Sequence, residues 1–282
     1  MICCTNPFKY TLEIALKYPQ SLKYREIING NWIENECIND WIKKKYDKRW
    51  KKWIVYNDEN PLDLDKTAKG HCKGVLSWNK KKVSWLIHSV PKFPEKLDKQ
   101  GISGIDYSQL KFGQSFVYIE FDITHLNEVL QQVYLMNPNI YINSGGGVEA
   151  TPASKLTNDY KIYPINENIT HLAKSSAFEK DIYEEILIPE FGNSCMVESW
   201  LRGQVIPESD KVSHIKELNG LGNTMYESSA DHSKFAISMD SKRKWVFIGD
   251  LNRMESQRKR GGGGLLVYDD LIHKAFMDII VC

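Results

Sequence analysis

The sequence predicts a mixed α/β fold, in which two comparable halves form a pseudo-dimer and each half is a mixed β-sheet flanked by helices. Two observations carry this prediction. Segments with strand-like alternation are interspersed with segments of helical periodicity. In addition, one short pattern occurs twice about 160 residues apart, first as Gly70-His71-Cys72-Lys73 and then as Asp231-His232-Ser233-Lys234. A repeated motif of this kind suggests two half-sites that meet across a pseudo-twofold axis.

Each copy of the motif is followed by a predicted β-hairpin. In the first half the hairpin strands are 74–76 and 83–88, and in the second half they are 235–238 and 245–248. Trp85 follows His71 by fourteen residues, and Trp245 follows His232 by thirteen. The repeat divides the chain into an N-terminal half, 1–150, and a C-terminal half, 151–282, within one continuous domain. The segment 143–164, which is rich in Gly, Asn, Thr and Pro, is the predicted connection.

The remaining elements are predicted from periodicity in chain order. Ile42, Tyr46, Trp50 and Trp53 recur at helical spacing, so the lysines of 43–52 are expected on the solvated side of a helix. We expect a helix at 178–187 to end before Pro189, since proline lacks the amide that the helix interior needs. Further strands are predicted at 12–16, 51–56, 116–121 and 195–202, and further helices at 126–135 and from Leu271 onward.

The repeated His-x-Lys pair favours phosphodiester chemistry. Side chains at i and i+2 of a strand project to the same side, so each His lies beside its Lys. A neutral imidazole is a nucleophile or a base, and the ammonium neutralises a phosphate oxygen. With two facing pairs, one His can attack phosphorus while the other protonates the leaving oxygen. The cationic pairs would supply the charge stabilisation, so no metal and no other cofactor is expected. A single His-x-Lys is usually surface decoration, but the repeat with matching hairpins favours the functional interpretation.

Composition is compatible with this interpretation. The chain has 282 residues, of which 26% are charged and 11% aromatic, as in ordinary folded proteins. The net charge of +1 does not argue against nucleic acid, because a nuclease needs only a local positive field. The six cysteines have no metal-like spacing. No apolar run is long enough to cross a membrane.

The two motif regions resemble a known family. Residues 70–75 with 85–94, Trp-Leu-Ile-His-Ser-Val-Pro-Lys-Phe-Pro, resemble the first signature block of the deoxyribonuclease II family. Asp231 to Lys234, then 249–253 and 257–263, resemble its second block. Weaker echoes are Tyr56-Asn57-Asp58, Phe112-Gly113-Gln114-Ser115 and Glu198-Ser199-Trp200. The resemblance runs from about Tyr24 to about Phe276, and the family in turn resembles the phospholipase D superfamily in fold and in paired His-Lys chemistry.

The resemblance implies a phospholipase D-like pseudo-dimer that acts as a metal-independent acid endonuclease and hydrolyses double-stranded DNA to 3′-phosphate ends. The catalytic residues that it implies are His71, Lys73, His232, Lys234 and His88. The substrate-binding residues would be Asn252, Gln114, Asn57 and Arg260. Which of the two motif histidines attacks phosphorus stays open at this point, with His232 favoured.

The family also implies a lysosomal or secreted protein, but two features depart from that pattern. Ala236, Phe247 and Val267 stand where secreted members carry cysteines, so the family's disulfide framework is largely missing. Residues 1–19 contain no recognisable signal peptide, because Lys9, Glu13 and Lys17 interrupt the apolar positions.

Two other functions remain as alternatives. One is a catalytically inactive homologue that binds DNA without cutting it, and the other is a phospholipase D-like phosphodiesterase that acts on lipid. The intact His-x-Lys pairs argue against the first, and the His-Ser-Val-Pro and Arg-Gly-Gly-Gly signatures argue against the second. The expected partner is therefore DNA, with no membrane and no metal, and a homodimer is left open.

Overall fold

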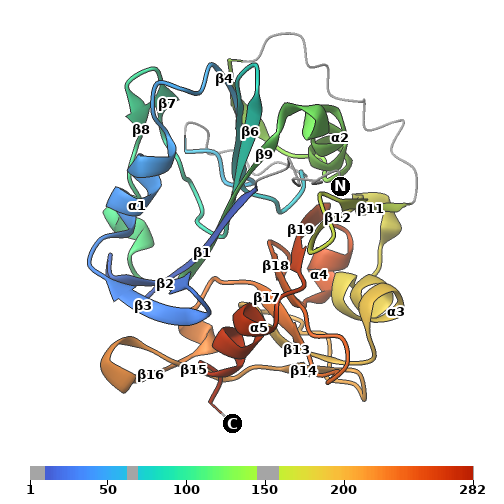
Figure 1. Ribbon diagram of the computed structural model, residues 1–282. Helices are drawn as coiled ribbons and strands as arrows, with labels where there is room; N and C mark the ends of the chain where they lie inside the picture. The colour runs from blue at the N-terminus through green and yellow to red at the C-terminus, as the bar shows by residue number, and fades with distance from the viewer. Residues whose placement is uncertain (1–9, 62–68, 145–158, 282) are drawn as a thin grey trace, which may run out of the picture.

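The computed structural model describes residues 10–61, 69–144 and 159–281. Two large sheets dominate it (Figure 1), one of eight strands in the order β10-β4-β5-β6-β9-β1-β2-β3 and one of seven in the order β11-β12-β19-β18-β17-β13-β14. Every pairing within them is antiparallel except that of β13 with β14, which is parallel. The fold is therefore mixed α/β, as the sequence predicts.

The first sheet contains strands from residues 11 to 143. They are β1 Thr11–Lys17, β2 Tyr24–Ile28, β3 Asn31–Asn35, β4 Lys52–Tyr56, β5 Gly74–Trp78, β6 Lys82–His88, β9 Gln114–Asp122 and β10 Ile140–Asn143. The second contains β11 Tyr160–Pro164, β12 Ile169–Lys174, β13 Cys195–Glu198, β14 Val212–His214, β17 Phe235–Ser238, β18 Val246–Gly249 and β19 Gly262–Val267. Two small ribbons are β7 Leu97–Asp98 with β8 Gly101–Ile102, and β15 Glu217–Asn219 with β16 Met225–Glu227.

The helices are short and lie around the sheets. They are α1 Ile38–Lys45, α2 Leu126–Leu135, α3 Ile188–Phe191, α4 Glu255–Arg258 and α5 Asp270–Met277. The helix predicted at 178–187 is a π-helix over Tyr183–Leu187 that runs directly into α3, so the chain does not leave the helix before Pro189. Pro189 lies in the first turn of α3, where its missing amide costs little. The strand predicted at 195–202 ends at Glu198, and the helix predicted within 42–53 ends at Lys45.

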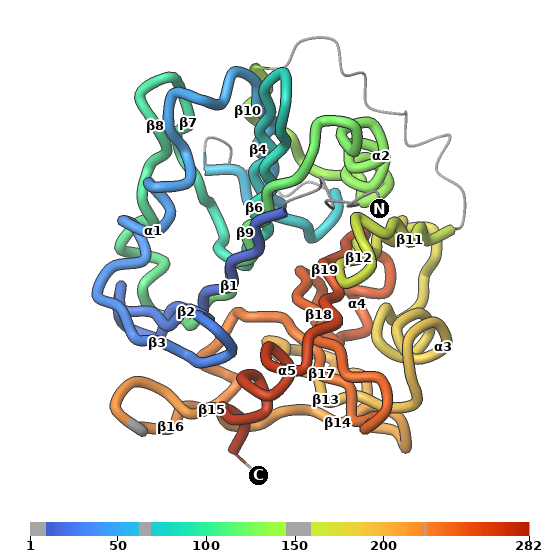
Figure 2. The backbone as a smooth tube through the Cα atoms, in the orientation of Figure 1, coloured from blue at the N-terminus to red at the C-terminus, as the bar shows by residue number. Residues whose placement is uncertain are grey.

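The core forms in three layers around the sheets. The central cluster lies between them and joins Ile54 and Trp85 of the first sheet to Phe235 and Ile248 of the second. A second cluster covers the outer face of the first sheet together with α1, and a third covers the outer face of the second sheet together with α3. Figure 2 shows the blue-to-green strands and the yellow-to-red strands as two separate groups that face each other. Each sheet therefore buries apolar side chains on both faces.

The two motif hairpins have the same hydrogen-bond register. The amide of His88 donates to Lys73 O (3.3 Å), and the amide of Gly249 donates to Lys234 O (2.9 Å). His88 follows His71 by the same number of residues as Gly249 follows His232. This register makes Val246, not Trp245, the counterpart of Trp85. Accordingly Trp85 packs between the sheets while Trp245 packs on the outer face of the second sheet.

The sequence suggested that Trp85 and Trp245 are equivalent, and this is wrong by one residue. Because neighbouring residues of a strand face opposite ways, the two rings pack on different faces of their sheets. The predicted boundary at residue 150 lies outside the described residues and stays a prediction. Within the described part of the chain, no helix is long and apolar enough to span a bilayer.

Candidate active site

The two motif segments are held by backbone hydrogen bonds that cross between the halves. The amide of His71 donates to Gly261 O (2.8 Å), and the amide of His232 donates to Gly113 O (2.9 Å). Gly113 directly precedes β9 and Gly261 directly precedes β19, so the two contacts correspond. A Cβ on Gly113 would lie 2.6 Å from Asp231 Oδ1, and one on Gly261 would lie 2.1 Å from Met136 O. Glycine is needed at both positions because a Cβ would clash with the Asp231 carboxylate or with the Met136 backbone.

The two motif lysines are buried and folded back along their own segments. Lys73 Nζ donates to His71 O (3.2 Å), and Lys234 Nζ donates to His232 O (2.6 Å). Lys73 is 2% exposed and Lys234 3%, so neither is a surface lysine. Burial, followed by the charge of Lys73, lowers the pKa of Lys234 to about 7. Buried ammonium groups that crowd each other in this way are stabilised by an anion.

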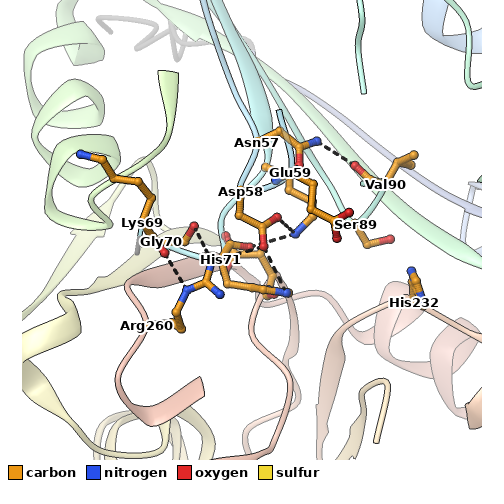
Figure 3. A network of polar contacts seen from close by, with 12 residues as sticks. Asn57, Asp58, Glu59, Lys69, Gly70, His71, Ser89, Val90, His232 and Arg260 are labelled. Atoms are coloured by element: carbon orange, nitrogen blue, oxygen red, sulfur yellow. Dashed lines mark hydrogen bonds and ion pairs between the residues drawn. The ribbon is translucent and has the colours of Figure 1, made fainter. Parts of the chain in front are cut away.

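His71 is held by polar groups from both halves. Its Nδ1 lies 2.5 Å from Asp250 O, so this nitrogen carries the proton of the neutral ring and Nε2 carries the lone pair. Asp58 lies on the other side, with Oδ2 3.7 Å from His71 Nε2 and Oδ1 2.5 Å from Lys73 Nζ. Arg260 pairs with the same carboxylate at 3.3 Å and also donates to Lys69 O and Gly70 O. Figure 3 shows this cluster around Asp58.

His232 has a different environment, made of aromatic rings. The ring of Phe112 stacks on the imidazole with centroids 4.0 Å apart and planes 12° apart. The Trp200 ring approaches at 4.2 Å with a tilt of 54°. His232 Nε2 is buried and has no hydrogen-bond partner among the described residues. The backbone bond to Gly113 explains the stack, because it brings Phe112 against the motif.

The two pairs lie within electrostatic reach of one another. Burial and then Lys234, Lys73 and His71 lower the pKa of His232 to about 2. Burial, Lys73 and Lys234 also lower the pKa of His71, while Asp58 opposes them. Burial alone would raise the pKa of Asp58, but Lys73, His71 and Arg260 hold it below its usual range. In Figure 3 His232 lies across from the His71 cluster. The structure thus brings both His-x-Lys pairs to one region, with both imidazoles neutral and one ionised carboxylate between the cations.

Of the other predicted site residues, His88 and Asn252 are buried, whereas Arg260 is partly exposed. His88 packs near Phe93 and Phe116, and burial lowers its pKa to about 3, so it is a neutral residue behind Lys73. Asn252 is buried beside the second motif block with its Oδ1 unpartnered among the described residues. Arg260 reaches the His71 cluster through Asp58.

The structure does not bring Asn57 and Gln114 to an open groove. Both side chains are 0% exposed. The Asn57 amide donates to Val90 O and Phe93 O, each at 2.9 Å, and so fastens the loop after β6. Gln114 Oε1 accepts from the Ser89 hydroxyl at 2.5 Å. In this geometry the two amides support the first motif from behind.

Four residues of the site were not singled out as functional by the sequence: Asp58, Asp250, Phe112 and Trp200. Asp58, Phe112 and Trp200 lie within the weaker family echoes, and Asp250 lies within the second signature block; these matches were the only signals available. The strand pairing reveals how they correspond. In the first sheet Tyr56 pairs with Gly74, and Asp58 lies two residues after Tyr56. In the second sheet Glu198 pairs with Phe235, and Trp200 lies two residues after Glu198. Arg260 precedes Gly261, whose carbonyl accepts from the His71 amide. In the same way Phe112 precedes Gly113, whose carbonyl accepts from the His232 amide. His71 therefore has Asp58 and Arg260 where His232 has Trp200 and Phe112.

The chemistry of the donors does not suggest a metal centre. Across residues 10–61, 69–144 and 159–281, no group of three or more His, Cys, Asp or Glu is arranged to hold a metal ion. The described cysteines Cys37, Cys72 and Cys195 are free thiols. The two motif lysines, Lys73 and Lys234, are instead both buried at the site, and such ammonium groups are suited to bind an anion.

Comparisons with known proteins agree with the motifs. Deoxyribonuclease-2 of Caenorhabditis elegans is 32% identical over 243 residues, which cover 79% of this chain and 64% of that protein. Deoxyribonuclease-2-beta of Mus musculus is 29% identical over 250 residues, which cover 79% and 68% respectively. Cell-death-related nuclease 7 of Caenorhabditis elegans is 26% identical over 292 residues, which cover 92% and 78%.

The chain therefore spans slightly less than two thirds of the first of these relatives. The family model of Deoxyribonuclease II matches residues 34–282, which include both His-x-Lys motifs and every residue placed around them above. With a match of that extent, the chain belongs to the deoxyribonuclease II family.

Proposed function

We propose that this protein is a metal-independent acid endonuclease that hydrolyses double-stranded DNA to 3′-phosphate ends. The observation that carries the proposal is the convergence of two buried His-x-Lys pairs, each anchored by a backbone bond to the opposite half. The nuclease names of the relatives support DNA as the substrate. An acidic compartment, lysosomal or extracellular, is the setting that we propose for it.

We assign the attack on phosphorus to His232. Burial and the neighbouring cations lower the pKa of its imidazole to about 2, so it stays neutral even in acid, and the Phe112 ring stacks on it. Attack forms a bond between nitrogen and the phosphorus of the scissile phosphate, and the bond to the 5′ oxygen of the next nucleotide breaks. The 3′-phosphate is then linked to the enzyme as a phosphohistidine. Lys73 and Lys234 neutralise the oxygens of the phosphate in this step.

We assign the proton transfers to His71. Asp250 O accepts from Nδ1, and Asp58 lies beside Nε2, so both groups stabilise an imidazolium. In the first step His71 gives a proton to the departing 5′ oxygen. In the second step it removes a proton from water, which cleaves the phosphohistidine and releases the 3′-phosphate. Burial and the nearby cations lower the pKa of His71 in the free site, and a bound phosphate raises it because the anion offsets those cations.

A plasmid-nicking assay in EDTA tests the activity. We expect nicking that persists in the chelator and falls as the pH rises from about 4 to about 8, since His71 loses its proton. His232→Ala should abolish it, whereas His125→Ala, a histidine outside both motifs, should not. Inhibition by EDTA would refute the metal-free mechanism. Retention of DNA without cutting would support a silent binding protein, and cleavage of phospholipid vesicles alone would support a lipid phosphodiesterase.

A substrate with an activated leaving group tests the division of roles. In the 4-nitrophenyl ester of thymidine 3′-phosphate, the nitrophenolate replaces the 5′ oxygen and leaves without protonation. His71→Ala should then form the phosphoenzyme in a burst that releases one nitrophenolate per protein molecule. His232→Ala should give no burst. The reverse result would exchange the two roles while leaving the paired-histidine mechanism in place.

A further inference from the structure

The two half-sites differ at corresponding positions, and the second one presents rings instead of charges. Trp200 and Phe112 occupy the places that Asp58 and Arg260 occupy around His71. A carboxylate and a guanidinium orient an imidazole through charge. Two rings orient it by contact and present no negative charge to an incoming anion. The difference therefore raises the question of what the ring-lined side of the site receives.

The three rings touch one another but do not enclose the imidazole. The Phe112–His232 and Trp200–His232 centroids are 4.0 and 4.2 Å apart, and the Phe112–Trp200 centroids are 5.7 Å apart. These lengths put Phe112 and Trp200 on adjacent sides of the histidine, because rings on opposite faces would be separated by the sum of the first two. Trp200 Nε1 donates to Ser229 O (3.3 Å), which fixes the indole to the segment that leads into the motif. Both rings are only partly buried.

An exposed cation lies over each of these rings. The guanidinium of Arg202 is 5.0 Å from the Trp200 centroid, and Lys111 Nζ is 5.3 Å from the Phe112 centroid. The positive charge of Arg202 reaches His232, where it is one of the causes that lower the pKa of the imidazole. In the described part of the chain neither cation has an ion pair. Unpaired cations stacked on partly exposed rings form a surface that fits a nucleic-acid strand.

We propose that Phe112, Trp200, Lys111 and Arg202 form a docking surface for the nucleotide next to the scissile phosphate. The rings contact its sugar and base, and the two cations bind the phosphate that flanks the one undergoing attack. The inference rests on the proposed nuclease function and extends it, since it assigns residues that hold DNA beyond the reacting group. Arg202 is the main determinant because its planar guanidinium can stack on the indole and bind phosphate at the same time.

The test compares a long and a minimal substrate. Arg202→Ala should raise KM for duplex DNA by about tenfold and lower the salt dependence of binding by about one unit of slope. It should leave the turnover of the 4-nitrophenyl ester of thymidine 3′-phosphate within about twofold of the wild type, because that ester has no flanking phosphate. Arg202→Lys should restore part of the affinity. Arg243→Ala is the matched control, since Arg243 is also exposed and stacked on a ring, Tyr268 at 5.2 Å, outside the site.

The outcomes separate this inference from the function on which it rests. Equal losses on both substrates would mean that Arg202 acts only through His232, and no loss on duplex DNA would also overturn the docking surface. If the wild type cleaves neither substrate, the proposed function fails. Fluorescence anisotropy with labelled duplex DNA then decides the docking surface alone. A weaker affinity for duplex DNA in Arg202→Ala but not in Arg243→Ala would support the docking surface. Equal affinities of the two variants would overturn it.

Discussion

Among the residues that the structure describes, Asp58 is the one ionised carboxylate in contact with the first His-x-Lys pair. It pairs with Lys73 and Arg260 and lies beside His71, while the corresponding place in the second half is taken by Trp200. Its negative charge raises the pKa of His71 against the cations that lower it. Asp58 thus acts through its neighbours and positions the group to which we assign the proton transfers.

Replacing Asp58 by Asn tests this positioning role. We expect kcat/KM for plasmid DNA to fall by about 10- to 100-fold, less than the full loss of general acid–base catalysis, since His71 itself remains. Because the substitution removes the negative charge that stabilises the His71 imidazolium, the decline of activity with rising pH should begin at a more acidic pH. Asp98→Asn, at an exposed carboxylate paired with Lys96, is the control. A uniform loss at every pH would indicate a purely structural role.

Asp250 is a second buried carboxyl group, and its charge state differs from that of Asp58. Burial raises its pKa to about 7, although its Oδ1 accepts from the Gly263 amide at 2.9 Å. A raised carboxyl pKa means that the folded state binds the proton more tightly than the unfolded state. Ionising Asp250 therefore costs stability. The cost is absent below the unfolded pKa, grows as the pH rises through the folded pKa near 7, and is full above it.

Asp250→Asn should accordingly stabilise the protein above pH 7 by about 1–4 kcal/mol and change little near pH 4. The amide oxygen can still accept from Gly263, so the hydrogen bond is kept. Urea unfolding of the variant and the wild type at both pH values measures the effect. Equal stabilities above pH 7 would contradict a raised pKa at this residue.

At this scale the sequence predicted the motif residues but not their surroundings. A repeated pattern can be recognised in the sequence alone, and it indicated His71, Lys73, His232 and Lys234. It did not indicate Phe112 and Trp200, because they reach His232 only through pairing between distant segments. Asn57 and Gln114 belong to recognisable motifs, yet a motif does not reveal whether a side chain faces substrate or supports a loop.

At the scale of elements, the hairpins set the geometry of both half-sites. The sequence predicted β5 with β6 and β17 with β18, since alternation and charged turns are strong local signals. It paired Trp85 with Trp245, and the hydrogen bonds show a register one residue away. In the two large sheets, strands β2, β3, β10, β11, β12 and β14 were not predicted, and β11 lies within the segment 143–164 that was predicted to be a connection. Periodicity also missed the π-helix, because a helix with an extra residue per turn leaves no distinct pattern in the sequence.

Gly113 and Gly261 hold the motif segments together at this scale, and substitution tests them. Gly113→Ala places a Cβ 2.6 Å from Asp231 Oδ1, so the buried Asp231 carboxylate or the Gly113 segment must shift, and we expect the bond from the His232 amide to weaken. We expect a loss of about 2–4 kcal/mol in unfolding free energy and little nicking activity. Gly222→Ala is the control, because its Cβ would meet nothing within 4 Å, so only the cost of its φ of +60° remains, about 1 kcal/mol. Similar losses in both variants would contradict the close approach.

At the scale of the molecule, an ion pair joins segments that flank the two sheets. Asp58 follows β4 of the first sheet, and Arg260 precedes β19 of the second, yet their side chains pair at 3.3 Å. Arg260 also binds Lys69 O and Gly70 O just before His71. The two layers and the repeated motif were predictable from the sequence, whereas this pairing was not, since it depends on how the halves pack.

A double-mutant cycle of Asp58→Asn and Arg260→Gln measures that coupling. We expect a coupling free energy of about 1–3 kcal/mol in unfolding, because the partly buried pair is screened little by solvent. Lys274→Gln with Asp278→Asn, an exposed pair within one helix region, should give well under about 1 kcal/mol. A coupling between Asp58 and Arg260 no larger than that of the control would mean that the contact does not join the halves.

The crossed backbone bonds have a consequence for how such a molecule could be divided. Because the amide of each motif histidine donates to a carbonyl of the other half, a fragment that carries one motif would lack the hydrogen bond that holds its own histidine. Cutting the chain in the segment that links the sheets should yield two inert pieces. Their reassociation would restore both hydrogen bonds at once, so such fragments could serve as a reporter that gains activity when fused partners meet.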